Sequence, residues 1–264
     1  DLADECAGKH LKGQEIFFFT NDDAYILVEK RIREKLVNQF GFTDEEMPVF
    51  NPVRCNRNLI SNLLVDVPLY EPLVGRKGNS DLTVTILGGG EIGTEMFLSA
   101  YWFGQMLDHK LHINVVSQQS EAEFWGKIDY INPEIRHTTI PGDPILRVNR
   151  QGQMAPVYCS VGYRQQDVRS SAFMSALSGG EDALLNTDYF LVALGSDEEN
   201  IAAANQLRRF IQRHHMNKAQ DKKTVIAYVV YNTEMADILN RNRHYGYKKG
   251  ICDVYMCAVG NLRD

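Results

Sequence analysis

The sequence predicts an α/β fold with a doubly wound, mostly parallel sheet, and three observations support this fold class. Apolar strand-like segments alternate with amphipathic helix-like segments from residue 81 onward. One strand-like segment ends in a run of glycines and leads directly into a helix-like segment. A similar strand–turn–helix pattern lies near the N-terminus. Strands that alternate with helices form right-handed βαβ units, which build a parallel sheet covered on both faces.

The elements after residue 81 follow in a regular order. Short apolar runs predict strands, and longer runs with apolar residues at helical spacing predict helices. The predicted strands are Leu82–Leu87, Ile113–Val116, Tyr189–Leu194, Thr224–Val230 and Ile251–Val259. The predicted helices are Gly93–Leu107, Glu121–Ile131, Ser170–Leu177, Asp197–His214 and Glu234–Asn240.

An insertion is predicted at about 132–168, where turn-forming residues interrupt this alternation. They are Pro133, Pro141, Gly142, Asp143 and Pro144. Ile145–Val148 and Val157–Val161 are predicted as short strands within the insertion, which favours a hairpin.

The N-terminal part contains a shorter version of the same pattern. Its predicted elements are the strand Glu15–Phe19, the helix Asp23–Phe40, the strand Pro48–Phe50 and the helix Arg57–Leu64. Residues 17–26 resemble residues 192–201, since an apolar strand, a turn and two acidic residues precede a long helix in both. Asn51 and Asn232 follow the second strands. We therefore predict that residues 1–75 form the C-terminal half of a first Rossmann-like unit and residues 76–264 a complete one. The alternative is that two unrelated strand–turn–helix units share these features.

Composition narrows the class of protein. The chain has 28 Lys and Arg against 34 Asp and Glu, a net charge of −6, which disfavours a nucleic-acid binder. It has no apolar run of about 20 residues for a membrane span, and Asp1–His10 lacks the apolar core of a signal peptide. The five cysteines form no CxxC pair, which favours free thiols and a cytoplasmic protein. Because the chain does not begin with Met, we expect it to be part of a longer protein.

The strongest motif is the glycine-rich turn at residues 87–93. Gly88, Gly90 and Gly93 fit the GxGxxG pattern, with Gly89, Glu91 and Ile92 between them. In this pattern the first glycine permits a tight turn, the second lets a pyrophosphate approach the backbone, and the third lets the helix pack closely on the sheet. The turn therefore predicts a dinucleotide-type phosphate site, and the alternative is a glycine-rich turn without a ligand.

The end of the second strand lacks the acidic residue that binds ribose hydroxyls in NAD sites. Ser117 occupies that position and Gln118 follows it, while Glu121 comes four residues late. No Arg adjoins this position to bind a 2′-phosphate. Ser117 and Gln118 remain candidate sugar ligands, and the site is expected to take an unusual nucleotide, to bind weakly or to be vestigial.

A second candidate segment is the turn after the fourth strand. Gly195, Ser196, Asp197 and Asn200 lie where ligands bind at the carboxyl ends of parallel strands. Ser196 and Asp197 are equally suited to cap the following helix.

No catalytic or metal-binding set can be assembled from spacing. The chain has no GxSxG, GxxxxGK[ST], HExxH or EF-hand pattern. Tyr130, His137 and Tyr163 are available to an oxidoreductase, but nothing singles them out. His214 and His215 are expected at a helix C-terminus rather than on a metal, Cys252 and Cys257 in packing, and Asp22 and Asp23 as helix caps.

The glycine-rich turn and the segment Asp188–Ile201 together resemble the TrkA-N or RCK family, the Rossmann regulatory domains of bacterial potassium uptake systems and channels. The resemblance covers Asp81–Arg241 and, as a half-copy, Glu15–Leu64. It implies that Gly88, Gly90, Glu91 and Ile92 line a pyrophosphate site and that Asp197 and Asn200 lie near the crevice. Ser117 and the long insertion depart from the family pattern.

The resemblance implies a non-catalytic nucleotide-sensing regulatory domain. Its ligand would be NAD(H) or another adenine nucleotide, and its partners a second copy of the chain and a membrane transporter or effector outside this sequence. Two alternatives stay open, an NAD(P)-dependent oxidoreductase and a protein-interaction domain with a vestigial nucleotide site.

Overall fold

The computed structural model describes residues 14–20, 25–76, 81–106, 109–133, 135, 145–148, 154–157, 159–179, 182–218, 222–241 and 254–260. The chain divides into two compact units, Asp1–Asn58 and Leu59–Asp264. The division lies earlier than the boundary expected at residue 75. The reason is that Leu59, Ile60 and Leu63 of helix α3 (Cys55–Asp66) are buried in the core of the larger unit.

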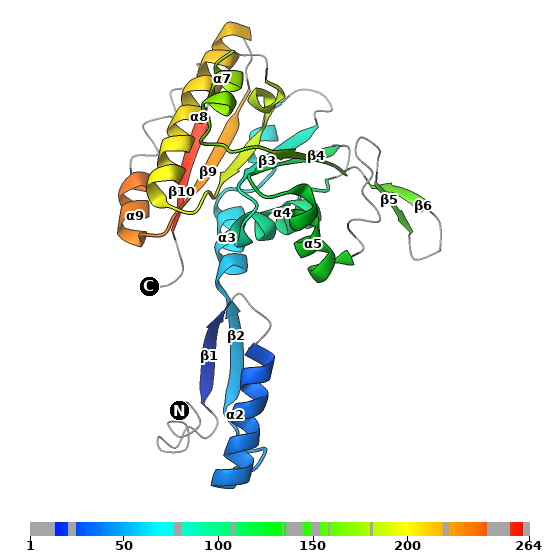
Figure 1. Ribbon diagram of the computed structural model, residues 1–264, viewed down its shortest axis with the longest axis vertical. Coiled ribbons are helices and arrows are strands. Elements are labelled where there is room, and N and C mark those ends of the chain that lie inside the picture. Colours follow the sequence, from blue (N-terminus) through cyan, green and yellow to red (C-terminus); the bar gives the residue numbers. More distant parts are fainter. Residues whose placement is uncertain are drawn as a thin grey trace. The chain divides into compact units, whose positions relative to one another are not determined.

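The larger unit contains a six-stranded parallel sheet (Figure 1). Its strands are β3 (Leu82–Leu87), β4 (Leu111–Ser117), β7 (Cys159–Gln165), β8 (Tyr189–Val192), β9 (Thr224–Val230) and β10 (Val254–Gly260). They lie side by side in the order β10-β9-β8-β3-β4-β7. Read from β7, this is the chain order 3-2-1-4-5-6 of the Rossmann fold. The predicted α/β, doubly wound fold class is therefore confirmed.

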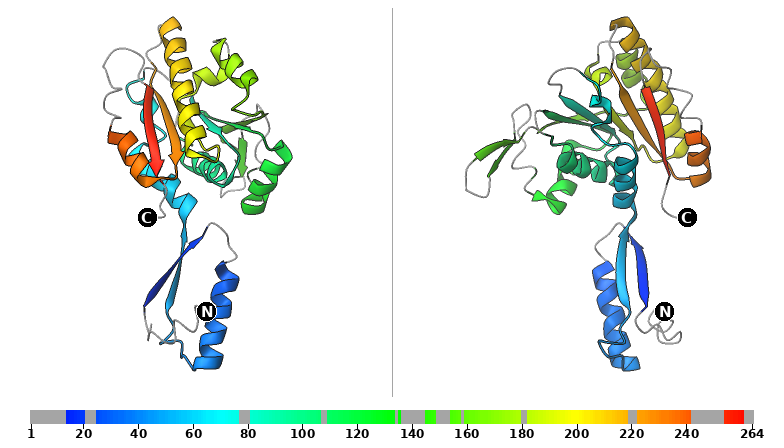
Figure 2. Two further views of the ribbon diagram at one scale, coloured as in Figure 1. Left: turned by 60° about the vertical axis from the view of Figure 1, so that its left-hand side comes forward. Right: turned by 180° about the vertical axis from the view of Figure 1, so that it is seen from behind.

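Helices cover both faces of this sheet (Figure 2). One core contains side chains of α3, α4 (Glu91–Phe103) and α5 (Glu121–Ile131), and the other contains side chains of α7 (Ser171–Ser178), α8 (Asp197–Lys218) and α9 (Thr233–Arg241). All seven residues of β9 are buried, and alternate ones enter opposite cores. Burial on both faces explains the continuous apolar runs of the central strands.

The strand β7 lies inside the segment expected to be an insertion, and this corrects the sequence interpretation. It pairs with β4 from Leu111↔Cys159 to Ser117↔Gln165 as the third strand of the sheet. The antiparallel pair β5 (Ile145–Val148) and β6 (Met154–Val157) precedes it. β7 mixes polar and apolar residues because it is an edge strand, so its sequence lacks the apolar run of the inner strands.

The smaller unit contains β1 (Glu15–Thr20), α2 (Tyr25–Phe40) and β2 (Val49–Arg54). β1 and β2 are parallel, and α2 packs on them through Ile32 and Leu36. Asn51 lies within β2, where its amide donates to Glu15, whereas Asn232 caps α9. The two asparagines therefore do not correspond, although both segments form parallel βαβ units. Asp22 and Asp23 lie outside the described residues.

The short 3₁₀ turn η1 (Glu71–Leu73) contacts β9, and the short 3₁₀ turn η2 (Ala183–Asn186) contacts α8. Beside η2 the buried carboxylate of Asp188 accepts from Arg76 at 2.6 Å and from Lys222 at 2.9 Å.

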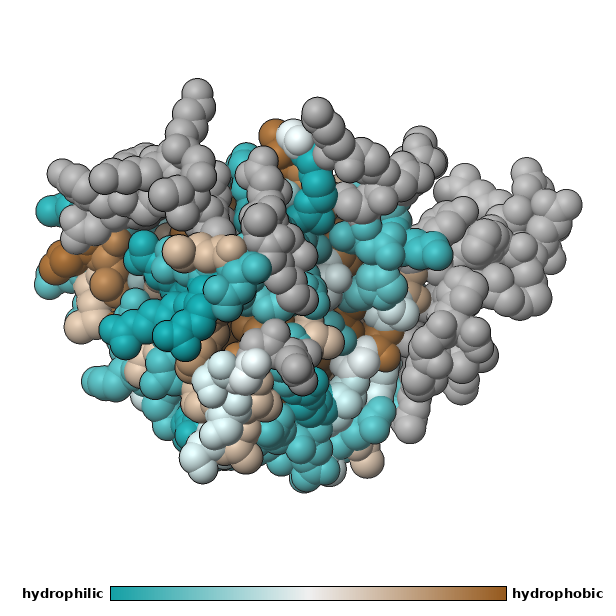
Figure 3. Space-filling view, turned by 90° about the horizontal axis from the view of Figure 1, so that it is seen from above, coloured by the Kyte–Doolittle hydropathy of each residue, from teal (hydrophilic) through white to brown (hydrophobic). Residues whose placement is uncertain are grey.

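Seen from above, hydrophilic residues cover most of the coloured surface and hydrophobic ones lie scattered among them (Figure 3). Within the described ranges, no helix combines the length and the apolar character needed to cross a membrane.

Candidate functional site

The candidate site lies where β3 and β8 end side by side. They are neighbours in the sheet but first and fourth along the chain, and the helices that follow them, α4 and α8, pack on opposite faces. In open α/β sheets, ligands bind in the crevice at such a switch point. The structure thus brings the glycine-rich turn and the turn at Gly195 to the same end of the sheet.

The three motif glycines have different surroundings. Gly88 has a φ of 115°, and a Cβ there would lie 2.0 Å from the Ala193 carbonyl oxygen. A Cβ at Gly93 would lie 1.9 Å from the Gly88 carbonyl oxygen. Both positions therefore require glycine for the fold itself. At Gly90 the φ is −69° and a Cβ would meet no atom within 4 Å. The backbone at Gly90 is thus open to an approaching group.

The helix α4 begins without a side-chain cap. Its N-cap is Gly90, and no side chain accepts a hydrogen bond there. In contrast, α5, α7, α8 and α9 begin with caps from Ser120, Ser170, Ser196 and Asn232. The first four amides of a helix have no partner within the helix, and its N-terminus attracts anions. The start of α4 is therefore suited to phosphate oxygens.

Glu91 and Ile92 differ in what they can offer a ligand. Glu91 is an exposed acid in the first turn of α4. The Ile92 side chain is buried in the core beneath the crevice. Only the backbone of Ile92 is thus placed to contact a phosphate.

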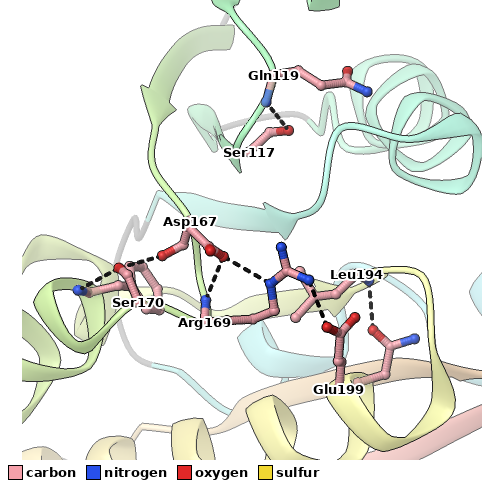
Figure 4. Close-up of polar contacts among 9 residues, drawn as sticks. Ser117, Gln119, Asp167, Arg169, Ser170, Leu194 and Glu199 are labelled. Atoms are coloured by element: carbon pink, nitrogen blue, oxygen red, sulfur yellow. Dashed lines mark hydrogen bonds and ion pairs between the residues drawn. The ribbon is translucent and has the colours of Figure 1, made fainter.

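The turn after β4 closely approaches the glycine-rich turn. Ser117 is buried, and its hydroxyl accepts from the Gln119 amide at 3.2 Å (Figure 4). A Cβ at Gly89 would lie 2.8 Å from the Ser117 Oγ. Gln118 is exposed, and its carbonyl accepts from Gln165 at 3.5 Å. Ser117 is therefore the last residue of β4 and lies against the glycine-rich turn, and its role as a sugar ligand stays a prediction.

Lys127 reaches this junction from α5 and was not predicted as a site residue. Its Nζ donates to the Gly89 carbonyl oxygen at 3.1 Å and to the Gln119 Oε1 at 3.0 Å. The ammonium group thus links the two turns. Its role depends on how α5 packs beside the glycine-rich turn, and no local sequence pattern reveals that.

The residues of the turn after β8 make internal contacts. The Asp197 carboxylate accepts from the amides of Tyr231 at 2.6 Å and Asn232 at 3.2 Å. Asn200 is fully buried, accepts from the Leu194 amide at 2.6 Å and donates to the Val229 carbonyl at 2.9 Å. These two side chains tie the turns after β8 and β9 together. Gly195 has a φ of 116° and open space beside it.

A second feature not predicted is the ion-pair cluster of Asp167, Arg169 and Glu199. Arg169 donates from Nε to Asp167 at 3.0 Å and from Nη1 to Glu199 at 2.6 Å (Figure 4). Hydrogen bonds from the Arg169 amide and guanidinium lower the pKa of the Asp167 carboxyl. The cluster connects the turn after β7 to the first turn of α8 at the same end of the sheet.

The side chains considered for catalysis or metal binding are placed as follows. The Tyr163 hydroxyl donates to the Gln119 carbonyl at 2.7 Å, and burial raises its pKa. Tyr130 is 84% exposed, and His137 lies outside the described residues. His214 and His215 are buried within α8, which continues to Lys218. Over the ranges that the structure describes, no group of three or more His, Cys, Asp or Glu side chains could hold a metal ion.

Comparison with known proteins adds no family to this description. Neither a scan against protein-family models nor a search of curated proteins produced a match for the chain.

Proposed function

We propose that the larger unit is a non-catalytic, nucleotide-sensing regulatory domain that binds NAD(H) or another adenine nucleotide at the β3–β8 switch point. The observation that carries the proposal is the contrast among the three motif glycines. The fold requires Gly88 and Gly93, but it places no atom where a Gly90 side chain would go. An open glycine directly before an uncapped helix suits a pyrophosphate that approaches the backbone.

The proposed pose follows from the surrounding contacts. The pyrophosphate would lie against the start of α4, and the adenine ribose would lie beside Ser117 and Gln119. The regulatory role comes from the resemblance to TrkA-N and RCK domains, so its output would be a potassium transporter or another effector outside this chain. The polar side chains at the crevice also favour binding over chemistry, because Asp197, Asn200 and Tyr163 already engage backbone groups.

The test compares nucleotide binding by the wild type and by Gly90→Val. The matched control is Gly126→Val, because Gly126 of α5 also has open space around its Cβ position. A nucleotide at a hundredfold excess over its Kd should stabilise the wild type by about 2.7 kcal/mol. We expect this stabilisation in wild type and Gly126→Val, and its loss in Gly90→Val.

Two results would contradict the proposal. If no nucleotide stabilises the wild type, the site is vestigial and the protein-interaction alternative replaces it. If Gly90→Val binds as tightly as the wild type, the phosphate does not lie at this turn.

A further inference from the structure

The ammonium group of Lys127 is half-buried and donates to two neutral oxygens. These acceptors are a carbonyl and an amide oxygen, and an ammonium has three protons to donate. Among the described residues, Lys127 forms no ion pair within 4.0 Å, and its charge helps to lower the pKa of the Glu123 carboxyl from a longer distance. Other half-buried cations of the larger unit, Arg76 and Lys222, have Asp188 as a partner. A partly buried charge without a counter-charge in contact is costly, which favours an anionic ligand beside it.

The nearest acids of α5 are already engaged. Glu121 accepts from the Trp125 indole at 3.3 Å, and Glu123 accepts from the Ser120 amide and hydroxyl, each at 2.8 Å. Both carboxylates belong to exposed residues at the start of the helix. Glu123 attracts the Lys127 ammonium without contacting it, so the ammonium can still contact another anion.

The position of Lys127 indicates which anion fits. Its acceptors, Gly89 and Gln119, belong to the turns after β3 and β4, between which a dinucleotide places its adenine ribose. An acidic residue there accepts from the ribose 2′-hydroxyl in NAD sites and repels a 2′-phosphate. Here Ser117 takes the place of that acid. No Arg adjoins Ser117 in the sequence, and Lys127 of α5 supplies a cation at this place instead.

We propose that Lys127, together with Ser117, binds a phosphate monoester on the adenine ribose, so that the crevice selects a 2′-phosphorylated dinucleotide such as NADPH over NADH. This inference rests on the proposed function, since it needs a dinucleotide at the glycine-rich turn. It narrows the ligand from adenine nucleotides in general to those with a 2′-phosphate.

The experiment is a calorimetric titration of the whole chain with NADPH and NADH, and then with 2′-AMP and 5′-AMP. A charge-assisted contact of this kind corresponds to about a 10- to 100-fold difference in Kd. Lys127→Met removes the charge and keeps the length of the side chain. The control is Lys110→Met, because Lys110 is exposed in the same unit.

We expect wild type and Lys110→Met to bind NADPH about 10- to 100-fold more tightly than NADH, and 2′-AMP more tightly than 5′-AMP. Lys127→Met should lose this preference and bind NADPH no more tightly than NADH. An unchanged melting temperature without ligand would show that the variant still folds.

Three outcomes would overturn the inference, and they are distinguishable. Equal affinity for NADPH and NADH in the wild type would leave the proposed function intact but remove the 2′-phosphate selectivity. Equal weakening of both by Lys127→Met would place the ammonium on the pyrophosphate instead. Absence of binding by every dinucleotide would refute the proposed function, and this inference with it.

Discussion

Single residues of the crevice divide into those that hold the turns together and those that border open space. Asn200 and Asp197 satisfy backbone groups of the turns after β8 and β9, so their polar character is explained by the fold. Gly90 has no such explanation within the described contacts, and Lys127 links two turns without a carboxylate in contact with its charge. A ligand role rests mainly on these two residues.

Gly93→Ala is expected to destabilise the larger unit strongly. The new methyl group would lie 1.9 Å from the Gly88 carbonyl oxygen, so α4 or the turn must move. Overpacking of this kind costs about 1–3 kcal/mol or more in the free energy of unfolding. Urea denaturation measures the change, and Gly126→Ala in α5 is the control. A loss of less than about 0.5 kcal/mol for Gly93→Ala would contradict this tight packing.

At the scale of elements, the sequence predicted the strands that are buried on both faces. Their apolar runs and the glycines between them are local signals, and Thr224–Val230 and Glu121–Ile131 have the predicted bounds. The predicted strand Val157–Val161 overlaps the edge strand β7, but it was assigned to the insertion and ended too early because β7 mixes polar and exposed residues with buried ones. In the same way, the glycine-rich turn was predicted from its own spacing. Lys127 and Arg169 were not, because only tertiary packing brings them to the site.

The strand β1 carries apolar residues on both faces. Ile16 and Phe18 pack against α2, whereas Phe17 and Phe19 are 54% and 65% exposed. Strands of parallel sheets have this pattern when both faces are covered, and exposed apolar patches indicate interaction surfaces. We therefore expect the face of β1 that carries Phe17 and Phe19 to be the contact through which two chains pair.

Replacing Phe17 and Phe19 by Thr should reduce self-association of the chain. Threonine retains the preference for a strand while removing apolar surface. Sedimentation velocity over a range of concentrations measures the effect. Phe103→Thr is the control, because Phe103 is a 69% exposed phenylalanine of the other unit. A double variant that associates as the wild type does would show that β1 is not the contact.

At the scale of the whole molecule, stability depends on a histidine buried far along α8. His215 is fully buried, and within the described ranges its ring nitrogens make no well-formed hydrogen bond, although the Leu185 backbone interacts weakly with the ring. Burial, with smaller contributions from Lys222 and His214, lowers its pKa from 6.5 to about 4. The folded protein therefore holds this histidine neutral at pH values where the unfolded chain protonates it.

The free energy of unfolding is expected to fall as the pH decreases from 6.5 toward 4. In this window the unfolded state binds one proton more than the folded state, so each pH unit costs up to about 1.4 kcal/mol. Above pH 6.5 the imidazole is neutral in both the folded and the unfolded state, so this loss of stability is absent there. Urea denaturation at pH 7.5, 6.0 and 5.0 measures the slope. His215→Leu should reduce it, and an equal slope in wild type and variant would contradict the assignment.

The contact between Gly88 and Gly93 has a consequence for how this sequence can change over generations. A descendant that no longer needed a ligand would still keep both glycines, because any side chain at either position meets backbone atoms. Position 90 would be free to drift, since the fold accepts any residue there. In a collection of diverged descendants, the frequency of glycine at position 90, relative to positions 88 and 93, would therefore record whether selection still acts on binding.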